Sequence, residues 1–251
     1  MDREESCILT NLGRYFPLGE ADKKALLALE KSPYDASEKE LLWSANARIH
    51  NLYTLKSGWA CTYRDNLDGV RQIVDVLIPG DIVGLRDLTF AKHMAEARMI
   101  TKGTVCPFPL QNILDIINTS TPLAVALIAA IARQESILTE RMLITVNRSA
   151  RSRIAHFFVE MYSRLNRVKE TDIRRFYLPI SQQMLGEILG VSTVHVNRSL
   201  MALERENIVK KHRYYVEVMD TDRLFQEAEF NSDYLGDEMC DLRERLMMQA
   251  G

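Results

Sequence analysis

Residues 180–200 limit the fold of this chain most narrowly, because they combine the local signals that two crossed helices require. Ser181 and Ser192 are of the type that caps helix N-termini, and each precedes apolar residues at helical spacing. Gly190 between the two runs permits a tight turn, and Gly186 is small where the second helix would cross the first. The pattern predicts a helix-turn-helix.

A helix-turn-helix reads DNA with the first turns of its second helix. The side chains expected to face base edges in the major groove are Thr193, Val194, Asn197 and Arg198. The side chains expected to reach phosphates are Ser181, Gln182, Ser192 and His195. For Arg198 a base contact is favoured over a phosphate contact, whereas for His195 an exposed histidine without a ligand is the alternative.

The residues after this motif strengthen the interpretation. Two short strands at about residues 208–212 and 214–218 would form a wing, in which Lys210 and Lys211 could reach phosphate. Residues 148–215 contain 13 Lys and Arg against 6 Asp and Glu, although the whole chain has a net charge of −2. Because phosphate neutralisation supplies much of the affinity for DNA, this basic block favours a DNA contact, with a solvated basic surface as the alternative.

The region before the motif shows two further sequence patterns, one typical of strands and one typical of helices. Residues 34–110 alternate short runs rich in Val, Ile, Tyr and Thr with turn signals such as Asp68-Gly69, which predicts an antiparallel β-sandwich or barrel. A long helix is predicted to begin with Thr121 as cap and Pro122 at its first position, and to end near residue 147. A second helix is expected at about residues 149–168.

The long helix has apolar residues at spacings of mostly three or four. This pattern fits a core helix over the β-region, or a dimer contact that small residues at 129–132 would favour. The residues expected at a dimer interface are Leu123, Leu127, Ala130, Ile131, Leu138 and Met142.

Several classes of protein are disfavoured. The most apolar stretch, residues 123–131, is too short to span a membrane, and the acidic N-terminus does not resemble a signal peptide. Four widely separated cysteines without a CxxC pair give little support for a metal site, and suggest a reducing cytoplasm. A cupin-type enzyme would need clustered His and carboxylate ligands, and no HxH, HExxH or Gly-rich phosphate loop occurs, so no enzyme is expected.

Together with the helix-turn-helix, three segments resemble the Crp/Fnr family of transcription regulators over nearly the whole chain. These segments are Leu55-Lys56-Ser57-Gly58, residues 78–84 (Ile-Pro-Gly-Asp-Ile-Val-Gly) and Ser152-Arg153-Ile154-Ala155. The resemblance implies an α+β fold with an N-terminal antiparallel β-roll of the cyclic-nucleotide-binding type, a long dimerisation helix and a C-terminal winged helix-turn-helix.

The expected parts are a sensor β-roll at residues 1–120, the dimerisation helix at 121–147, the DNA-binding domain at 148–220 and an acidic helical tail at 221–251. A loosely ordered tail is the alternative to a helical one. The resemblance further implies a cytoplasmic homodimer on a palindromic site in double-stranded DNA, and RNA polymerase as a partner if the protein is an activator.

By the same resemblance, an effector pocket would contain Gly84, Leu85, Arg86, His93 and Met94. Cyclic-AMP-responsive members have Glu where Leu85 stands and an Arg-Ser pair near His93 and Met94, so cyclic AMP is not expected to bind in the usual mode. Oxygen-sensing members carry an N-terminal cysteine cluster, whereas this chain has only Cys7 there.

Two alternatives for the signal and the operator stay open. His50 or His93 could ligate haem, which makes a haem sensor of the same fold the alternative to a regulator with another small-molecule effector. The residues themselves identify no cofactor and no metal. Many members have Arg and Glu where Thr193 and Val194 stand, so the half-site should differ from the common family sequence.

Overall fold

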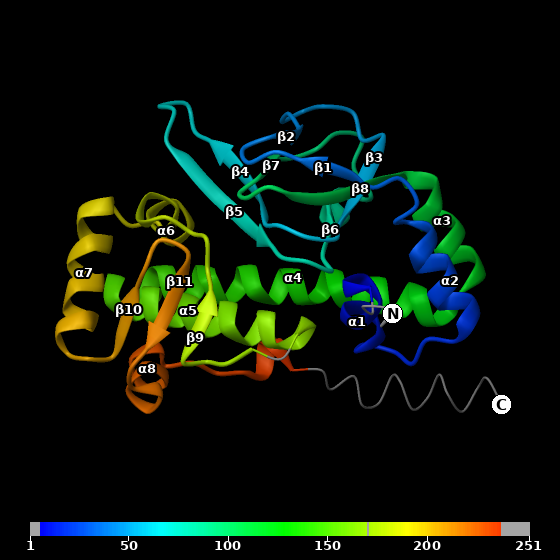
Figure 1. The fold of residues 1–251 in the computed structure, drawn as a ribbon. Coiled ribbons are helices and arrows are strands. Elements are labelled where there is room, and N and C mark those ends of the chain that lie inside the picture. Colours follow the sequence, from blue (N-terminus) through cyan, green and yellow to red (C-terminus); the bar gives the residue numbers. More distant parts are fainter. Residues whose placement is uncertain (1–5, 170, 237–251) are drawn as a thin grey trace.

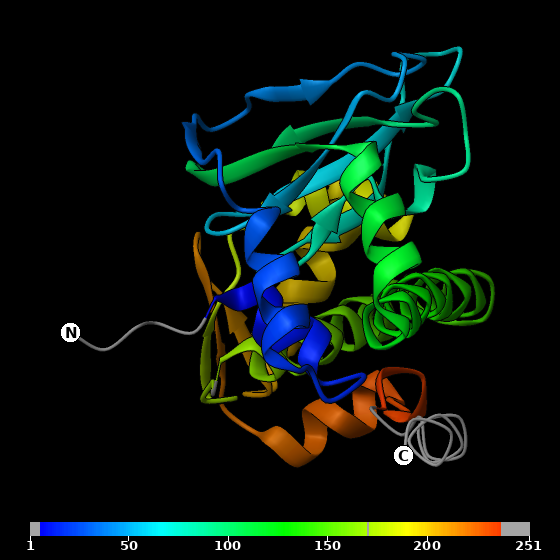
Figure 2. The ribbon, with the colours of Figure 1, turned by 90° about the vertical axis from the view of Figure 1, so that its right-hand side faces the viewer.

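The computed structural model describes residues 6–169 and 171–236. Figure 1 shows strands β1 to β8 as an upper layer, with helices α4 and α5 running beneath them. Helices α1 to α3 cover one end of this arrangement, and the small three-stranded sheet with α6 and α7 forms the other end. In Figure 2, α4 is viewed nearly end-on and lies below the strands.

The upper layer consists of two antiparallel four-stranded sheets, in the strand orders β1-β8-β3-β6 and β2-β7-β4-β5. Its strands are β1 (Tyr34–Ala36), β2 (Leu41–Trp43), β3 (Asn51–Leu55), β4 (Ala60–Asp65), β5 (Arg71–Leu77), β6 (Ile82–Val83), β7 (Glu96–Met99) and β8 (Gly103–Pro109). The helical elements around it are α1 (Cys7–Gly13), α2 (Glu20–Ala28), the 3₁₀ turn η1 (Leu85–Asp87) and α3 (Leu110–Thr119). The expected antiparallel β-structure is confirmed, including the hairpin that joins β4 and β5 at Asp68-Gly69.

The C-terminal half contains the expected helices and wing. Its helices are α4 (Thr121–Asn147), α5 (Ala150–Val168), α6 (Gln182–Leu189), α7 (Thr193–Arg205), α8 (Thr221–Ala228) and the 3₁₀ turn η2 (Asp233–Leu235). Its strands are β9 (Arg175–Tyr177), β10 (Val209–Lys211) and β11 (Tyr215–Val218), which pair in the order β10-β11-β9. The acidic tail is described as far as Gly236, and the remaining tail positions lie outside the described residues.

Helix α4 begins and continues somewhat differently from the sequence expectation. Ser120 is the cap, because its hydroxyl accepts a hydrogen bond from the amide of Leu123 at 3.2 Å, and Thr121 is already helical.

By length and composition alone, α4 could cross a membrane: its best 18-residue window has a mean hydropathy of 1.3, with 28% of that window buried. Residues 123–131, which alone are too short to span a membrane, continue unbroken into this longer helix.

Helix α5 joins the β-domain to the helix-turn-helix. Ile154, Phe157 and Phe158 on α5 belong to one buried cluster with Trp59 and Ile73 of the β-domain and with the apolar residues of α6 and α7. Burial of this shared apolar surface provides the main favourable free energy for holding the two domains together. The DNA-binding end therefore packs directly on the β-domain and is not connected to it by a linker alone.

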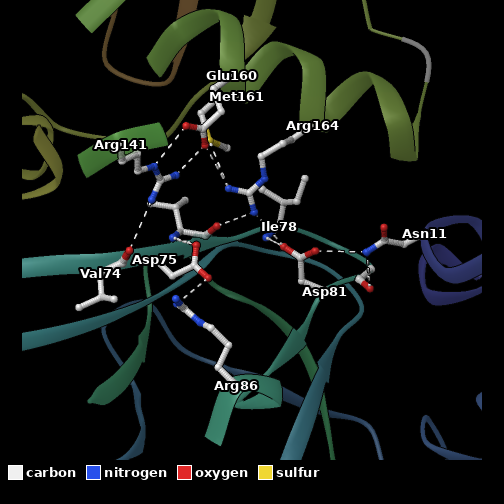
Figure 3. A network of polar contacts seen from close by, with 12 residues as sticks. Asn11, Val74, Asp75, Ile78, Asp81, Arg86, Arg141, Glu160, Met161 and Arg164 are labelled. Carbon is white, nitrogen blue, oxygen red and sulfur yellow. Dashed lines mark hydrogen bonds and ion pairs between the residues drawn. The ribbon is translucent and has the colours of Figure 1, made fainter. Parts of the chain in front are cut away.

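Buried charges fix how α5 sits on the β-domain (Figure 3). Glu160 on α5 accepts two hydrogen bonds from Arg141 on α4, at 2.6 and 3.2 Å, and lies 3.6 Å from the guanidinium of Arg164. Burial alone would raise the pKa of Glu160, but the two arginines hold it below its ordinary value. Glu160 is therefore a buried carboxylate with a cation on either side.

The same two arginines reach the β-domain (Figure 3). Arg164 donates to the carbonyl of Val76 at 2.7 Å and to the carboxylate of Asp81 at 3.2 Å. Asp81 also accepts a hydrogen bond from the side chain of Asn11 in α1 at 3.2 Å. The network thus connects α1, α4, α5 and the β-domain, and we refer to it as the Glu160 network.

His156 lies one helical turn before Glu160 on α5 and is wholly buried. Its ring packs against Phe230 and Tyr234 of the segment after α8, and neither ring nitrogen has a hydrogen-bond partner among the described residues. Burial lowers its pKa from 6.5 to about 4, and Arg148 and Arg141 add to this effect while Glu160 opposes it. The carboxylate oxygen Oε1 of Glu140 also lies 3.7 Å from Nε2 of His156. The histidine is therefore neutral in the folded protein near neutral pH.

This burial predicts a loss of stability in mild acid. Between about pH 6.5 and pH 4 the unfolded chain binds a proton at His156 that the folded chain does not, so the free energy of unfolding falls as the pH falls. Replacing His156 with Phe should remove roughly 2 to 3 kcal/mol of this loss, measured by urea unfolding at pH 7 and pH 4.5. His50→Phe, at an exposed position, is the matched control. An unchanged pH dependence in His156→Phe would contradict the assignment.

Candidate nucleic-acid interface

Helices α6 and α7 form the predicted helix-turn-helix, and each begins at the predicted serine. The Ser181 hydroxyl accepts from the amide of Met184 at 3.1 Å, and that of Ser192 accepts from the amide of His195 at 3.4 Å. Gly190 ends α6 in the left-handed region at φ 64°, which favours glycine. A Cβ on Gly186 would lie 2.5 Å from the carbonyl oxygen of residue 191, so only glycine permits this close crossing.

Helix α7 buries one face and exposes the other. Val196, Leu200 and Leu203 face the core that α7 shares with α5 and α6. The side chains predicted to read bases are all exposed: Thr193, Val194, Asn197 and Arg198. Val194 is 60% exposed, which leaves its side chain available for contact with a thymine methyl group.

The outward face of α7 is longer than the sequence pattern predicts. Met201 and Arg205 are also exposed, and they continue the spacing of four, three and four residues that begins at Val194 and Arg198. The helical period of the exposed positions could have identified them, since residues at i+4, i+7 and i+11 share a face. Their distance from the N-terminus of α7 places them beyond the turns that usually reach base edges.

Of the side chains predicted to contact phosphate at the helix N-termini, Ser181, Ser192 and His195 are exposed and Gln182 is half-buried, and all four already have hydrogen-bond partners within the protein. The Ser192 hydroxyl lies 3.0 Å from Nδ1 of His195. Oε1 of Gln182 accepts a hydrogen bond from Nδ2 of Asn197 at 3.2 Å, which connects α6 to α7. The N-terminal dipole of each helix also favours an anion beside these side chains.

The two wing lysines expected to contact phosphate lie in different environments. Lys210 is at the surface and pairs with Glu204 at 2.6 Å. Nζ of Lys211 instead points inward and donates to the carbonyls of Leu178 at 3.0 Å, Arg213 at 3.3 Å and His212. Burial lowers the pKa of Lys211 to about 8. The structure therefore does not place Lys211 for a phosphate contact, because its ammonium group closes the wing loop.

The predicted dimer residues divide between two faces of α4. Leu123 and Leu127 are buried in the protein's own core, and Ala130 and Ile131 pack against the same cluster. Leu138 is half-buried and Met142 is 61% exposed. For Leu123 and Leu127 the interface prediction is wrong, because the three-to-four spacing expected to mark a dimer contact marks the face toward the β-domain.

A different face of α4 is exposed. Its outward positions alternate spacings of three and four residues, and we call them the α4 stripe. They are the half-buried Val125 and the exposed Ile128, Ala132, Glu135, Thr139, Met142 and Val146. Ile128 and Val146 are 66% and 75% exposed, so the stripe presents apolar side chains to solvent in a single copy of the chain.

The five residues of the predicted effector pocket do not face one common space. Leu85 is buried in the core, Arg86 pairs with Asp75 at 3.0 Å, and Met94 is exposed. His93 stacks on the Trp43 ring at 4.1 Å and its Nδ1 lies 2.8 Å from Asp87.

The space above Gly84, the remaining pocket residue, is occupied by side chains. A Cβ on Gly84 would meet Leu52 at 2.9 Å and Trp43 at 3.2 Å. The pocket therefore stays a prediction that the geometry does not favour. His50, the second candidate haem ligand, is exposed, and residues 6–169 and 171–236 contain no group of three His, Cys, Asp or Glu side chains placed to hold a metal ion.

A winged helix-turn-helix with an exposed second helix, attached to a β-roll, defines a DNA-binding regulator class. A family model of the cyclic nucleotide-binding domain matches residues 35–120, and one of the Crp-like helix-turn-helix domain matches residues 152–227. The transcriptional activatory protein AadR of Rhodopseudomonas palustris is 29% identical over 221 residues, which cover 88% of this chain and 91% of AadR.

A second curated regulator and a solved structure are also similar over most of this chain. The transcriptional activator protein Anr of Pseudomonas protegens is 23% identical over 220 residues, covering 88% of this chain and 90% of Anr. The structure of FixK2 from Bradyrhizobium japonicum has a TM-score of 0.70 at 23% identity, and the match covers 78% of this chain and 96% of FixK2. This chain belongs to the Crp/Fnr family of transcription regulators. It is a DNA-binding regulator and not an enzyme, as the sequence predicts.

The two wing lysines should differ in how they affect the salt dependence of DNA binding. Removing one phosphate contact to duplex DNA lowers the slope of log K against log salt by about 0.9. We expect Lys210→Met to lower the slope by about this amount for each subunit, and Lys211→Met to leave it unchanged, measured by fluorescence anisotropy at four salt concentrations. A lower slope for Lys211→Met would show that its ammonium group reaches phosphate after all.

Proposed function

We propose that this protein acts as a homodimer, joined along the α4 stripe, that presents two copies of α7 to a palindromic operator. One observation chiefly supports the proposal: α4, which carries the stripe of exposed side chains, runs to the end of the molecule at which α7 lies (Figure 1). We also propose that cyclic AMP in the usual mode is not the effector.

The spacing of the α4 stripe supports pairing with a second copy of the same helix. Alternating steps of three and four residues average 3.5, the period of two helices that wind around each other. Ala132 near the middle of the stripe is small and would let the helices approach closely. Glu135 and Thr139 are polar positions that would cost some stability and would favour one register over others.

The position of the helix-turn-helix supports a dimer that contacts DNA with two-fold symmetry. The turn at Gly190 lies against the end of α4, since a Cβ there would be 3.7 Å from Cγ2 of Thr145. Arg153 at the start of α5 donates to the carbonyls of Arg148 and Leu189, which ties the α4–α5 junction to the end of α6. Two parallel copies of α4 would therefore carry both α7 helices at one end, as a palindromic DNA site requires.

The β-domain supports the statement about cyclic AMP. Leu85 and the region of His93 and Met94 lack the carboxylate, guanidinium and hydroxyl that hold the nucleotide in responsive members. Trp43 and His93 fill the space beside Gly84. We propose that the protein is cytoplasmic, and that RNA polymerase is a further partner where it activates a gene.

The dimer prediction is tested by placing charge in the stripe. Ile128→Glu puts a carboxylate into an apolar contact in each subunit, so we expect a monomer in sedimentation velocity where the unaltered protein is a dimer. Leu114→Glu makes the same change at an exposed position of α3 outside the stripe and should remain dimeric. A dimeric Ile128→Glu protein would place the interface elsewhere.

Arg198 is the α7 side chain expected to contact a base; it is exposed and has no hydrogen bond or ion pair within residues 6–169 and 171–236. Arg198→Ala should lose roughly 1 to 3 kcal/mol of preference per half-site for the operator over unrelated DNA. Salt-sensitive non-specific binding should remain, because the phosphate contacts are kept. Titration of both DNAs at one salt concentration measures this preference. If Arg198→Ala binds the operator as well as the unaltered protein does, the proposed docking is wrong.

A further inference from the structure

A cavity of about 560 Å³ lies between the β2-β7-β4-β5 sheet and the helix-turn-helix. It is lined by Cys61, Tyr63, Arg71 and Arg98 from the sheet, by Met184 of α6 and by Tyr214 of the wing loop. Its size falls within the range of roughly 300 to 1,000 Å³ that is typical of small-molecule sites. The cavity therefore has one wall in the β-domain and another in the DNA-reading domain.

The charges around the cavity favour an anion. Lys39, Arg71, Arg98 and Arg213 line it, against the carboxylates Glu38 and Glu187. Cations on neighbouring walls raise the local concentration of anions.

The two sheet arginines are not equivalent. The guanidinium carbons of Arg71 and Arg98 lie 3.7 and 4.5 Å from the centroid of the Tyr63 ring. Arg71 forms two hydrogen bonds of 2.9 Å with Asp65, through Nε and Nη2. Arg98 donates one hydrogen bond to the Tyr63 hydroxyl, while its Nε is buried and has no partner among the described residues. A buried donor without an acceptor is costly, and a ligand oxygen would remove that cost.

The remaining wall is apolar. Cys61 is buried, which raises its pKa to about 12, so it presents a neutral thiol. Ile73 on the neighbouring strand and Met184 on α6 add aliphatic surface, and the Tyr214 ring adds an aromatic one. A methionine adapts its shape to irregular ligands better than a branched side chain does.

We infer that this cavity binds a small organic anion, whose carboxylate or phosphate accepts hydrogen bonds from Arg98 and whose apolar body lies against Cys61 and Met184. The site is separate from the predicted effector pocket beside Gly84. A ligand here touches the sheet and α6 together, so its binding stabilises the docked arrangement of the two domains. The inference goes beyond the proposed dimer and does not depend on it.

The test uses the full chain and 8-anilinonaphthalene-1-sulfonate, a fluorescent aromatic anion, as the probe. We expect saturable binding of one probe per chain, and a loss of roughly tenfold or more in affinity for Arg98→Gln. Arg64→Gln is the matched control, because Arg64 is on the same sheet but exposed outside the cavity. It should bind the probe as the unaltered protein does.

A second variant approaches the cavity from its other wall. Met184→Trp fills the space from α6 and should also weaken probe binding, so the test stands even if Arg98→Gln does not fold. Thermal unfolding of each variant establishes that it is folded. Equal affinity of the unaltered protein, Arg98→Gln and Met184→Trp would overturn the inference.

Discussion

The ion pairs of Glu160 with Arg141 and Arg164 are the interaction on which the arrangement of this molecule depends. Glu160 is almost completely buried, and the two arginines that neutralise it also donate to the backbone of β5, at Val74 and Val76. Because a buried carboxylate deprived of its cation typically costs about 3 to 5 kcal/mol, α4 and α5 cannot rotate on the β-domain without losing this pairing or exchanging it. The network therefore sets the orientation of the DNA-reading end relative to the β-domain.

This orientation has two consequences for function. It turns Leu123 and Leu127 of α4 into the core and leaves Ile128, Met142 and Val146 on the outside, which defines the surface available to a second subunit. It also brings α6 against β5, where Nε2 of Gln72 donates to the carbonyl of Ile188 at 3.3 Å. The β-domain can thus act on the helix-turn-helix through direct contact as well as through the α4–α5 junction, and a ligand in the cavity between them would act at that contact.

Local sequence signals predict the elements well and their mutual packing less well. The caps at Ser181 and Ser192 and the turn at Gly190 specify the helix-turn-helix almost by themselves, since each acts within a few residues. The faces of α4 cannot be told apart from sequence, because Leu123 and Ile128 are equally apolar and only tertiary contacts decide which is covered. The charge of Lys211 suggests a DNA contact, but the fold of the wing turns this side chain toward three backbone carbonyls. The cavity escapes prediction because its walls come from residues more than a hundred positions apart.

We propose that two copies of this chain, paired along the α4 stripe, read DNA as a symmetric unit. Selection of bound sequences from a random DNA pool, with purified protein at fixed moderate salt, tests it most directly. We expect an enriched palindrome whose half-sites are centred about one helical turn apart, roughly 10 to 10.5 base pairs. A single asymmetric half-site, or no enrichment above non-specific binding even after cell extract is added to supply an effector, would contradict it.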